Sequence, residues 1–300
     1  MPLFFMVSGY LWSSRRNQID YKRLLLRDAK RYIIPYVILC GINLTLEFVL
    51  SLIAKNKYDL DKYILGILYS RGTTEWMPNC SPLWFLTAIL IALSVFDAVQ
   101  RVQSCWIRFA LIGAMGVCSA LLSHFNVFKL PWNIDTAMMG TVFVTFGFLM
   151  KQYGLLQRFN AQSFSTKTLL IILFTFVGYI AILMNPVESV DFDGNPYGNV
   201  ILMLIGSIPI CFVLFYLSYR TLWKGLITNY LSWLGQHTIF IMGFDYFSGS
   251  IARGVLEKVE FDNWASVFVL KAILLTIGCL LWNWAVSKIK NKSIRQALAY

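Results

Sequence analysis

The feature that most constrains this chain is a series of long, mostly apolar segments that recur from its first residues to its last. Hydrophobic residues make up 58% of the 300 residues, whereas soluble domains typically contain about 45–50%. A bilayer core offers backbone groups no hydrogen-bonding partner, so long unbroken apolar segments must be helices there. The pattern therefore predicts an all-α, polytopic membrane protein without a soluble domain.

We expect eight full spans and one partial span, which together form a single integral-membrane domain over residues 1–300. The partial span covers 2–12, and the full spans lie at about 33–54, 83–99, 107–124, 133–150, 168–185, 199–219, 230–247 and 265–287.

The loops between these spans alternate in charge. The loops at 13–32, 100–106, 151–167 and 220–229, with Arg108 and the tail from 288, carry 18 of the 26 Lys and Arg residues. The alternating loops at 55–82, 125–132, 186–198 and 248–264, with Lys271 just past the last of them, carry the other 8, and these loops hold nine of the 15 acidic residues. Positive charge collects in cytoplasmic loops, so we predict a cytoplasmic C-terminus in a multi-pass protein of the cell membrane. The net charge of +11 follows from this bias and does not indicate a nucleic-acid partner.

The N-terminal segment is too short to span a bilayer, because a spanning helix needs about 20 apolar residues and only eleven precede Ser13. The loop charges would also place Met1 outside. One additional upstream helix would place the N-terminus inside and give ten spans. We therefore expect the domain to be N-terminally incomplete and to lack its first helix.

Four segments follow one another in an informative order. The phrase FFMVSGY at 4–10 is followed by a basic segment that ends in Pro-Tyr at 35–36. The phrase SPLWFL opens the span at 83–99, and the segment 233–246 contains His237 and Asp245. The motif residues of the first and third segments are Phe4, Phe5, Ser8, Gly9, Trp84 and Phe85.

In this order the segments resemble the acyltransferase 3 family of integral-membrane O-acyltransferases, in particular its fucose 4-O-acetyltransferase-like branch. The resemblance implies a bacterial ten-helix fold, here without its first helix. It also implies transfer of an acetyl group from acetyl-CoA to a hydroxyl of a cell-surface polysaccharide or its sugar precursor. No metal is expected, since the six cysteines do not show metal-ligand spacing.

The basic segment has two interpretations. Arg23, Arg27, Lys30 and Arg31 recur at helical spacing and can share one helix face. They could anchor the chain at lipid headgroups, or they could bind the phosphates of coenzyme A, since Arg matches phosphate geometry. The resemblance favours the second interpretation.

The family's first-helix His, which acts as a general base or acyl carrier, has no counterpart in the sequence. Only two histidines are present. His124 is expected at an interface, so His237 and Asp245 are the remaining catalytic candidates.

Acidic residues inside spans are candidate functional groups, because an unpaired charge in lipid is costly. We expect Glu47 and Asp245 on the acceptor side, where carboxylates can bind sugar hydroxyls; the alternative is a structural pairing of each with Asn, Trp or Tyr on a neighbouring helix. Asp135 is expected close enough to an interface to be solvated. Trp84 and Phe85 are expected to pack around a substrate tunnel. Ser8 and Gly9 are expected to allow close helix approach.

Two alternatives stay open at this point. The chain could be a catalytically inactive, truncated member of the family. It could instead be a polytopic transporter of glycans or lipid-linked sugars, although no internal repeat of the kind found in many transporters is apparent.

Overall fold

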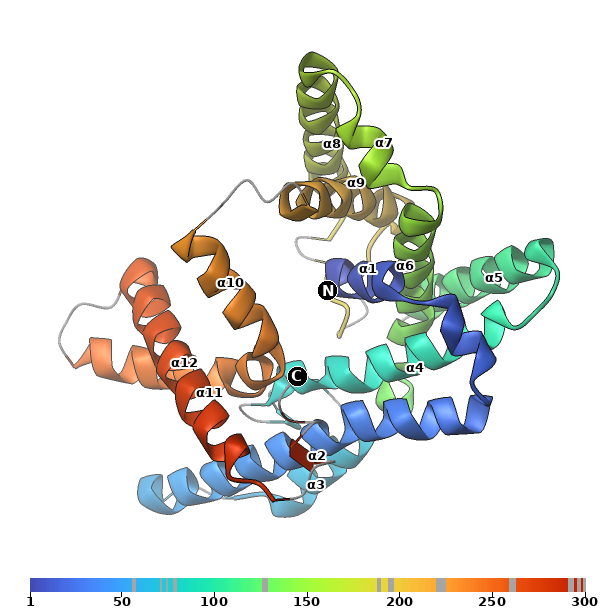
Figure 1. Ribbon diagram of the computed structural model, residues 1–300. Helices are drawn as coiled ribbons and strands as arrows, with labels where there is room; N and C mark the ends of the chain where they lie inside the picture. Colours follow the sequence, from blue (N-terminus) through green and yellow to red (C-terminus); the bar gives the residue numbers. More distant parts are fainter. Residues whose placement is uncertain are drawn as a thin grey trace. The chain divides into compact units, whose positions relative to one another are not determined.

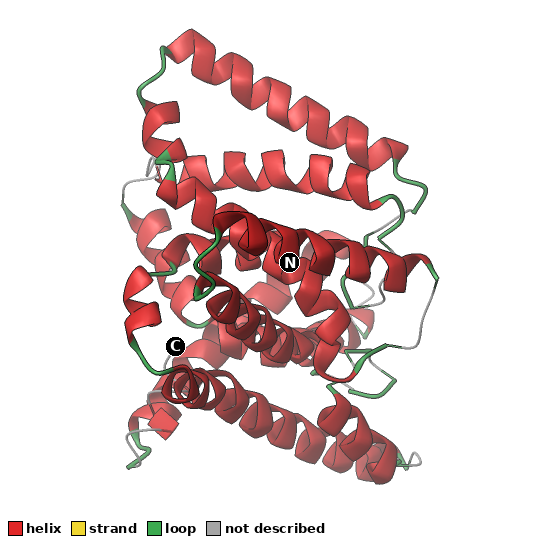
Figure 2. Cartoon of the chain, turned by 90° about the vertical axis from the view of Figure 1, so that its right-hand side faces the viewer, coloured by secondary structure: helices red, strands yellow, loops and turns green. Residues whose placement is uncertain are grey.

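The computed structural model describes residues 1–55, 58–70, 72–73, 75–77, 80–125, 129–187, 190–193, 197–219, 225–258, 263–290, 294–295 and 298. In this described part the regular elements are all helices (Figure 2). The α-helices are α1 Pro2–Leu11, α2 Tyr21–Ala54, α3 Leu60–Tyr69, α4 Trp84–Gln100, α5 Cys105–His124, α6 Ile134–Gln152, α7 Leu155–Asn160, α8 Phe164–Met184, α9 Val200–Tyr219, α10 Leu226–Gln236, α11 Thr238–Glu257 and α12 Trp264–Ser287. The short 3₁₀ helices are η1 Ser14–Gln18, η2 Ser81–Leu83 and η3 Pro131–Asn133.

Seven of the described helical segments are long and apolar enough to cross a membrane. They correspond to seven of the eight expected full spans, and the partial span appears as α1. The first full span starts earlier than expected, because α2 also includes the basic segment from Tyr21 onward. The chain is therefore an all-α, polytopic membrane protein.

The expected span at 230–247 is wrong as a single helix. Two helices, α10 and α11, meet at His237, whose backbone (φ −106°, ψ 16°) ends one helix and begins the next. Hydropathy does not detect this break, because apolar residues continue on both sides of it. The helix α11 then runs on to Glu257, well beyond the expected end.

The chain divides into two compact units. Unit 1 comprises residues 1–25 and 88–224, and unit 2 comprises residues 26–87 and 225–300. The division falls within α2 and within α4, so that each of these helices contributes residues to both units.

Unit 1 is built on paired helices. The helix α1 lies along α6, and α6 also packs against α5 (Figure 1). The helices α8 and α9 pack against each other. The first helix thus has an extensive partner within its own unit, which explains why a segment of only ten residues is held as a helix.

Unit 2 is built on α2 and the hairpin of α11 and α12. Its core is a cluster of buried side chains from α2, the segment before α4, and α4 itself: Tyr36, Leu39, Cys40, Met77, Cys80, Leu83 and Leu86. Side chains of α11 and α12, including Phe244 and Trp282, pack against this cluster.

Candidate functional site

The first motif packs α1 closely on α6. A Cβ atom added to Gly9 would lie only 1.9 Å from the carbonyl oxygen of Val144, and one added to Gly147 would lie 1.9 Å from that of Met6. The two backbones are therefore in direct contact at this point. The ring of Phe5 is fully buried beside Gly140. The hydroxyl of Ser8 donates to the carbonyl of Phe4 in its own helix (2.9 Å), while the Phe4 side chain is exposed.

A buried carboxylate joins the end of α1 to the basic segment. Asp97, only 1% exposed, accepts a hydrogen bond of 2.7 Å from Nε1 of Trp12. It also pairs with Arg16, whose Nε donates to Oδ1 at 2.9 Å and whose Nη2 contacts Oδ2. Charge-assisted, two-pronged contacts of this kind are strong and directional. Asp97 was not among the site residues predicted from the sequence, although it lies inside the expected span 83–99, where a charged residue indicates a structural or functional role.

Further contacts hold the turn between α1 and α2. Nη2 of Arg101 donates to the carbonyl of Ile19 at 2.7 Å, and its guanidinium lies over the ring of Tyr21. Nζ of Lys151 donates to the carbonyl of Trp12 at 3.0 Å. The start of α2 is thus fixed relative to α1 within unit 1.

The four predicted donor-site cations all lie on α2. Arg23, Arg27, Lys30 and Arg31 have exposed side chains, and their spacing places them along one side of the helix. Nε of Arg27 is 3.3 Å from Oδ1 of the adjacent Asp28, and the Arg31 guanidinium lies beside the ring of Tyr32. This face presents several positive charges that an anionic ligand can reach.

The second motif forms part of the interior. Trp84 and Phe85 are each 4% exposed, and their rings meet edge to face. The hydroxyl of Ser81 donates to the carbonyl of Gly72, which ties the segment before α4 into unit 2. These side chains define the shape of this unit rather than offering reactive groups.

His237 has a defined orientation. Its Nδ1 lies 2.8 Å from the carbonyl oxygen of Trp233, and the two rings are 4.6 Å apart. A carbonyl can only accept, so Nδ1 carries the hydrogen and Nε2 is left as the basic nitrogen. The side chain is half-buried at the break between α10 and α11.

The two predicted acceptor-side acids have different surroundings. Asp245 pairs with Lys271 at 2.7 Å, and its side chain is 37% exposed. Glu47 is half-buried near Tyr58 and Tyr63. The pKa of Tyr58 is raised by burial, by Tyr63 and by the negative charge of Glu47.

An uncharged polar residue of α2 is buried against α11 in unit 2. Asn43 is fully buried, and its Nδ2 donates to the carbonyls of Leu39 and Gly243, both at 2.9 Å. Because both partners can only accept, the amide orientation is fixed. Its Oδ1 has no hydrogen-bond partner among the residues that the structure describes. Nothing in the sequence distinguished this Asn from other polar residues in spans.

The expectation for Asp135 is wrong. Its side chain is 2% exposed rather than solvated, because the segment between α8 and α9 covers it. The hydroxyl of Thr136 donates to the carbonyl of Phe192, and the backbone N–H of Tyr197 donates to Ser123. His124, by contrast, is exposed at the end of α5.

The comparison with protein families is decisive for identity. Residues 1–288 match a family described as an acyltransferase domain. This chain belongs to the acyltransferase 3 family. The match covers both units, from the first motif in α1 to the end of α12. No curated protein and no solved structure matches the chain.

As a membrane acyltransferase, the chain must hold an acyl donor and an acceptor and move a proton between them. The predicted site residues fall in two groups. In unit 1 lie Phe4, Phe5, Ser8, Gly9 and Arg23. In unit 2 lie Arg27, Lys30, Arg31, Glu47, Trp84, Phe85, His237 and Asp245. Arg23 of the first set and the polar side chains of the second set are all exposed or partly exposed.

Proposed function

We propose that this acyltransferase moves an acetyl group from acetyl-CoA to a hydroxyl of a cell-surface polysaccharide or its sugar precursor. The two units act as one catalytic domain in the bacterial cell membrane, with the C-terminus in the cytoplasm. Acetyl-CoA comes from the cytoplasm, where the alternation of loop charge also places the basic segment.

The observation that carries this proposal is the exposed cationic face of α2. Coenzyme A carries several phosphate groups, and Arg side chains bind phosphate through paired N–H donors. Arg23, Arg27, Lys30 and Arg31 provide such donors along about two and a half turns of one helix. A surface that only anchored the protein at lipid headgroups would bind vesicles without preferring the coenzyme.

The groups of unit 2 provide the acceptor chemistry. Nε2 of His237 takes the proton from the acceptor hydroxyl, whose oxygen forms a bond to the acetyl carbonyl carbon. The carbon–sulfur bond breaks, and the coenzyme leaves as a thiolate that then takes up the proton. Glu47 and Asp245 accept hydrogen bonds from other sugar hydroxyls. Trp84 and Phe85 pack behind the substrate tunnel.

The test is equilibrium binding of radiolabelled acetyl-CoA to the full chain in lipid nanodiscs. We expect the double variant Arg27→Ala and Arg31→Ala to raise Kd at least ~10-fold, because a hydrogen bond to a charged group contributes about 1.5–3 kcal/mol. The matched control is Lys22→Ala, an exposed cation at the start of the same helix but on a neighbouring face. Equal binding by the double variant and the control would show that α2 does not hold the donor.

A further inference from the structure

The structure brings two cysteines that lie far apart in the sequence together in the core of unit 2. Cys40 is on α2, and Cys80 comes directly before η2. Both are thiols in this structure, and both are almost completely buried (0% and 2% exposed) in the same cluster of side chains. The two thiols also share a hydrogen bond. The sequence gives no sign of this pair, because Cys40 falls in an expected span and Cys80 in the loop at 55–82.

The neighbours of this pair hold both cysteines in place. The hydroxyl of Tyr36, one turn before Cys40, donates to the carbonyl of Ile67 at 2.6 Å and lies within hydrogen-bonding reach of the Cys40 thiol. The backbone carbonyl of Cys80 accepts a hydrogen bond of 3.0 Å from the N–H of Leu83 at the end of η2. Neither cysteine therefore lies on a freely moving segment.

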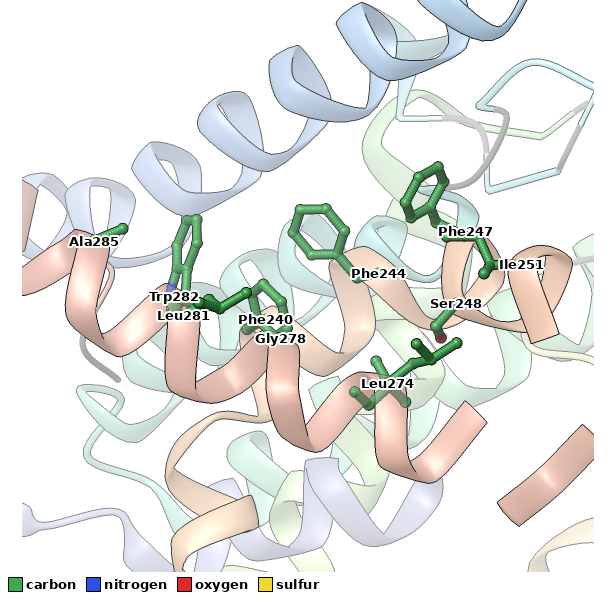
Figure 3. Close-up of a pocket in the computed structure, with 11 residues that line it drawn as sticks. Phe240, Phe244, Phe247, Ser248, Ile251, Leu274, Gly278, Leu281, Trp282 and Ala285 are labelled. Atoms are coloured by element: carbon green, nitrogen blue, oxygen red, sulfur yellow. The ribbon is translucent and has the colours of Figure 1, made fainter. Parts of the chain in front are cut away.

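Side chains of α11 and α12 cover the cluster that contains the two cysteines. Phe244 and Trp282 pack against it, and Figure 3 shows both among the aromatic and aliphatic side chains of the α11–α12 hairpin. Met77, a member of the cluster that follows α3, is fully buried as well. The contact between the two thiols is thus a fixed part of the core, and the folded chain shields both sulfur atoms from solvent.

Contact between two thiols allows a chemistry that a single buried cysteine does not have. A single buried thiol packs as a small apolar side chain, whereas two cysteines whose side chains face each other at close range can be joined by a disulfide. In the proposed orientation the loop at 55–82, which ends beside η2 and carries Cys80, faces the outside of the cell membrane. Disulfides form and persist in oxidising compartments of this kind.

We propose that Cys40 and Cys80 form a disulfide bond that joins α2 to the segment before α4. The bond forms by exchange with an oxidising disulfide of another protein or of a small molecule, while the chain folds and before both sulfur atoms are buried. One cysteine thiolate attacks a sulfur of that disulfide and displaces one thiolate, and the second cysteine thiolate then attacks the mixed disulfide and displaces the other. The two cysteine protons end on the displaced thiolates, so the cysteines are oxidised and the partner disulfide is reduced.

The bond closes a loop of about 40 residues that contains α3, and such a crosslink stabilises a protein mainly by restricting its unfolded chain. It ties the helix that carries the proposed donor cations to the segment that leads into Trp84 and Phe85. The bond depends on the proposed orientation and not on the proposed reaction. A chain with the bond but without acetyl transfer would therefore refute the reaction alone, and a chain that transfers acetyl without the bond would refute the bond alone.

The test is mass spectrometry of the full chain, isolated from its own membrane with N-ethylmaleimide present during lysis and denaturation. This reagent alkylates free thiols, so the exposed Cys105 and Cys118 provide the positive control. Without reductant, we expect a Cys40 peptide joined to a Cys80 peptide, lighter by two hydrogens than their sum and separated by dithiothreitol. Separately alkylated Cys40 and Cys80 would overturn the proposal, and so would a bond from either one to another cysteine.

Thermal unfolding in detergent provides a second measurement. We expect Cys80→Ala to lower Tm by at least ~5 °C, because the crosslink is lost. The matched control is Cys279→Ala, which removes an equally buried thiol of unit 2 on α12 and should lower Tm by less. Equal losses in the two variants would overturn the proposal. If Cys80→Ala fails to fold, the mass measurement still decides, since it needs no substitution.

Discussion

Asp97 of unit 1 and Asn43 of unit 2 are both buried polar residues, but they differ in how completely their side chains are hydrogen-bonded. Asp97 accepts from Trp12 and is paired with Arg16. Asn43 is buried as deeply, yet its Oδ1 has no described partner, and nearby Asp245 is partly exposed. The first arrangement links three side chains from distant parts of unit 1, and the second leaves one buried acceptor atom without a partner among the described residues. Asp97, Trp12 and Arg16 therefore stabilise the fold of unit 1, while the reacting groups that we propose, His237 and Asp245, lie in unit 2.

The largest effect on stability is expected for Asp97, which links Trp12 and Arg16 to α4. Replacing Asp97→Asn should lower the free energy of unfolding by about 3–5 kcal/mol, because Arg16 would be left as a largely buried charge without its partner. Denaturation in detergent, followed by tryptophan fluorescence, measures this loss. The matched control is Glu75→Gln, whose partner Lys62 forms a more exposed ion pair and whose loss should cost at most about 1 kcal/mol. Similar costs for both variants would contradict the structural role of Asp97.

The next effect concerns the contact between α1 and α6. We expect Gly9→Ala to destabilise the protein by about 1–3 kcal/mol, because its Cβ would overlap the carbonyl of Val144. Gly113→Ala in α5 is the control: its Cβ meets nothing within 4 Å, so the change should be neutral or stabilise by up to about 1 kcal/mol. The thermal unfolding temperatures of both variants measure this difference in stability. A Gly9→Ala protein as stable as the Gly113→Ala control would rule out close α1–α6 packing.

Two buried tyrosines show the reverse of the contrast between Asp97 and Asn43, because here the well-bonded polar atom lies in unit 2. The hydroxyl of Tyr36 in unit 2 donates to the carbonyl of Ile67 at 2.6 Å, so Tyr36→Phe should cost about 1 kcal/mol. The hydroxyl of Tyr197 in unit 1 lies near the Ser119 and Thr136 hydroxyls but forms no well-aligned hydrogen bond in the described part of the chain, so Tyr197→Phe should cost less than Tyr36→Phe. Chemical denaturation measures both. A larger loss for Tyr197→Phe than for Tyr36→Phe would reverse the assignment.

Tyr197 also gives a pH dependence. Burial, together with the negative charges of Asp135 and Asp191, raises its pKa to about 12, against the opposing effect of the Ser119 and Thr136 hydroxyls. Unfolded tyrosine ionises near pH ~10, so the folded state holds more protons between the two values. Stability should therefore fall as pH rises through this window. This part of the fall should be missing in Tyr197→Phe, and identical profiles for both proteins would contradict the raised pKa.

The sequence predicts the membrane helices well, because span length and apolar composition are local properties. It does not predict the break at His237, since hydropathy continues across it, nor the burial of Asp135, which depends on a segment about 60 residues away in the chain. The sequence shows Asp97 as an acid inside an expected span, but it does not show the partners of Asp97 or of Asn43. Their importance comes from Trp12, Arg16 and Gly243, which only the folded chain brings to them.

The most direct test of the division between structural and reacting groups is acetyl transfer by His237→Gln. Membrane vesicles from the producing cells, supplied with radiolabelled acetyl-CoA, report label in glycan, and Gly113→Ala serves as the reference variant. We predict that His237→Gln keeps its acetyl-CoA affinity and loses ~10²–10⁴-fold in transfer rate, as expected when a general base is removed. A transfer rate equal to that of the reference would contradict the account and place the reacting base elsewhere.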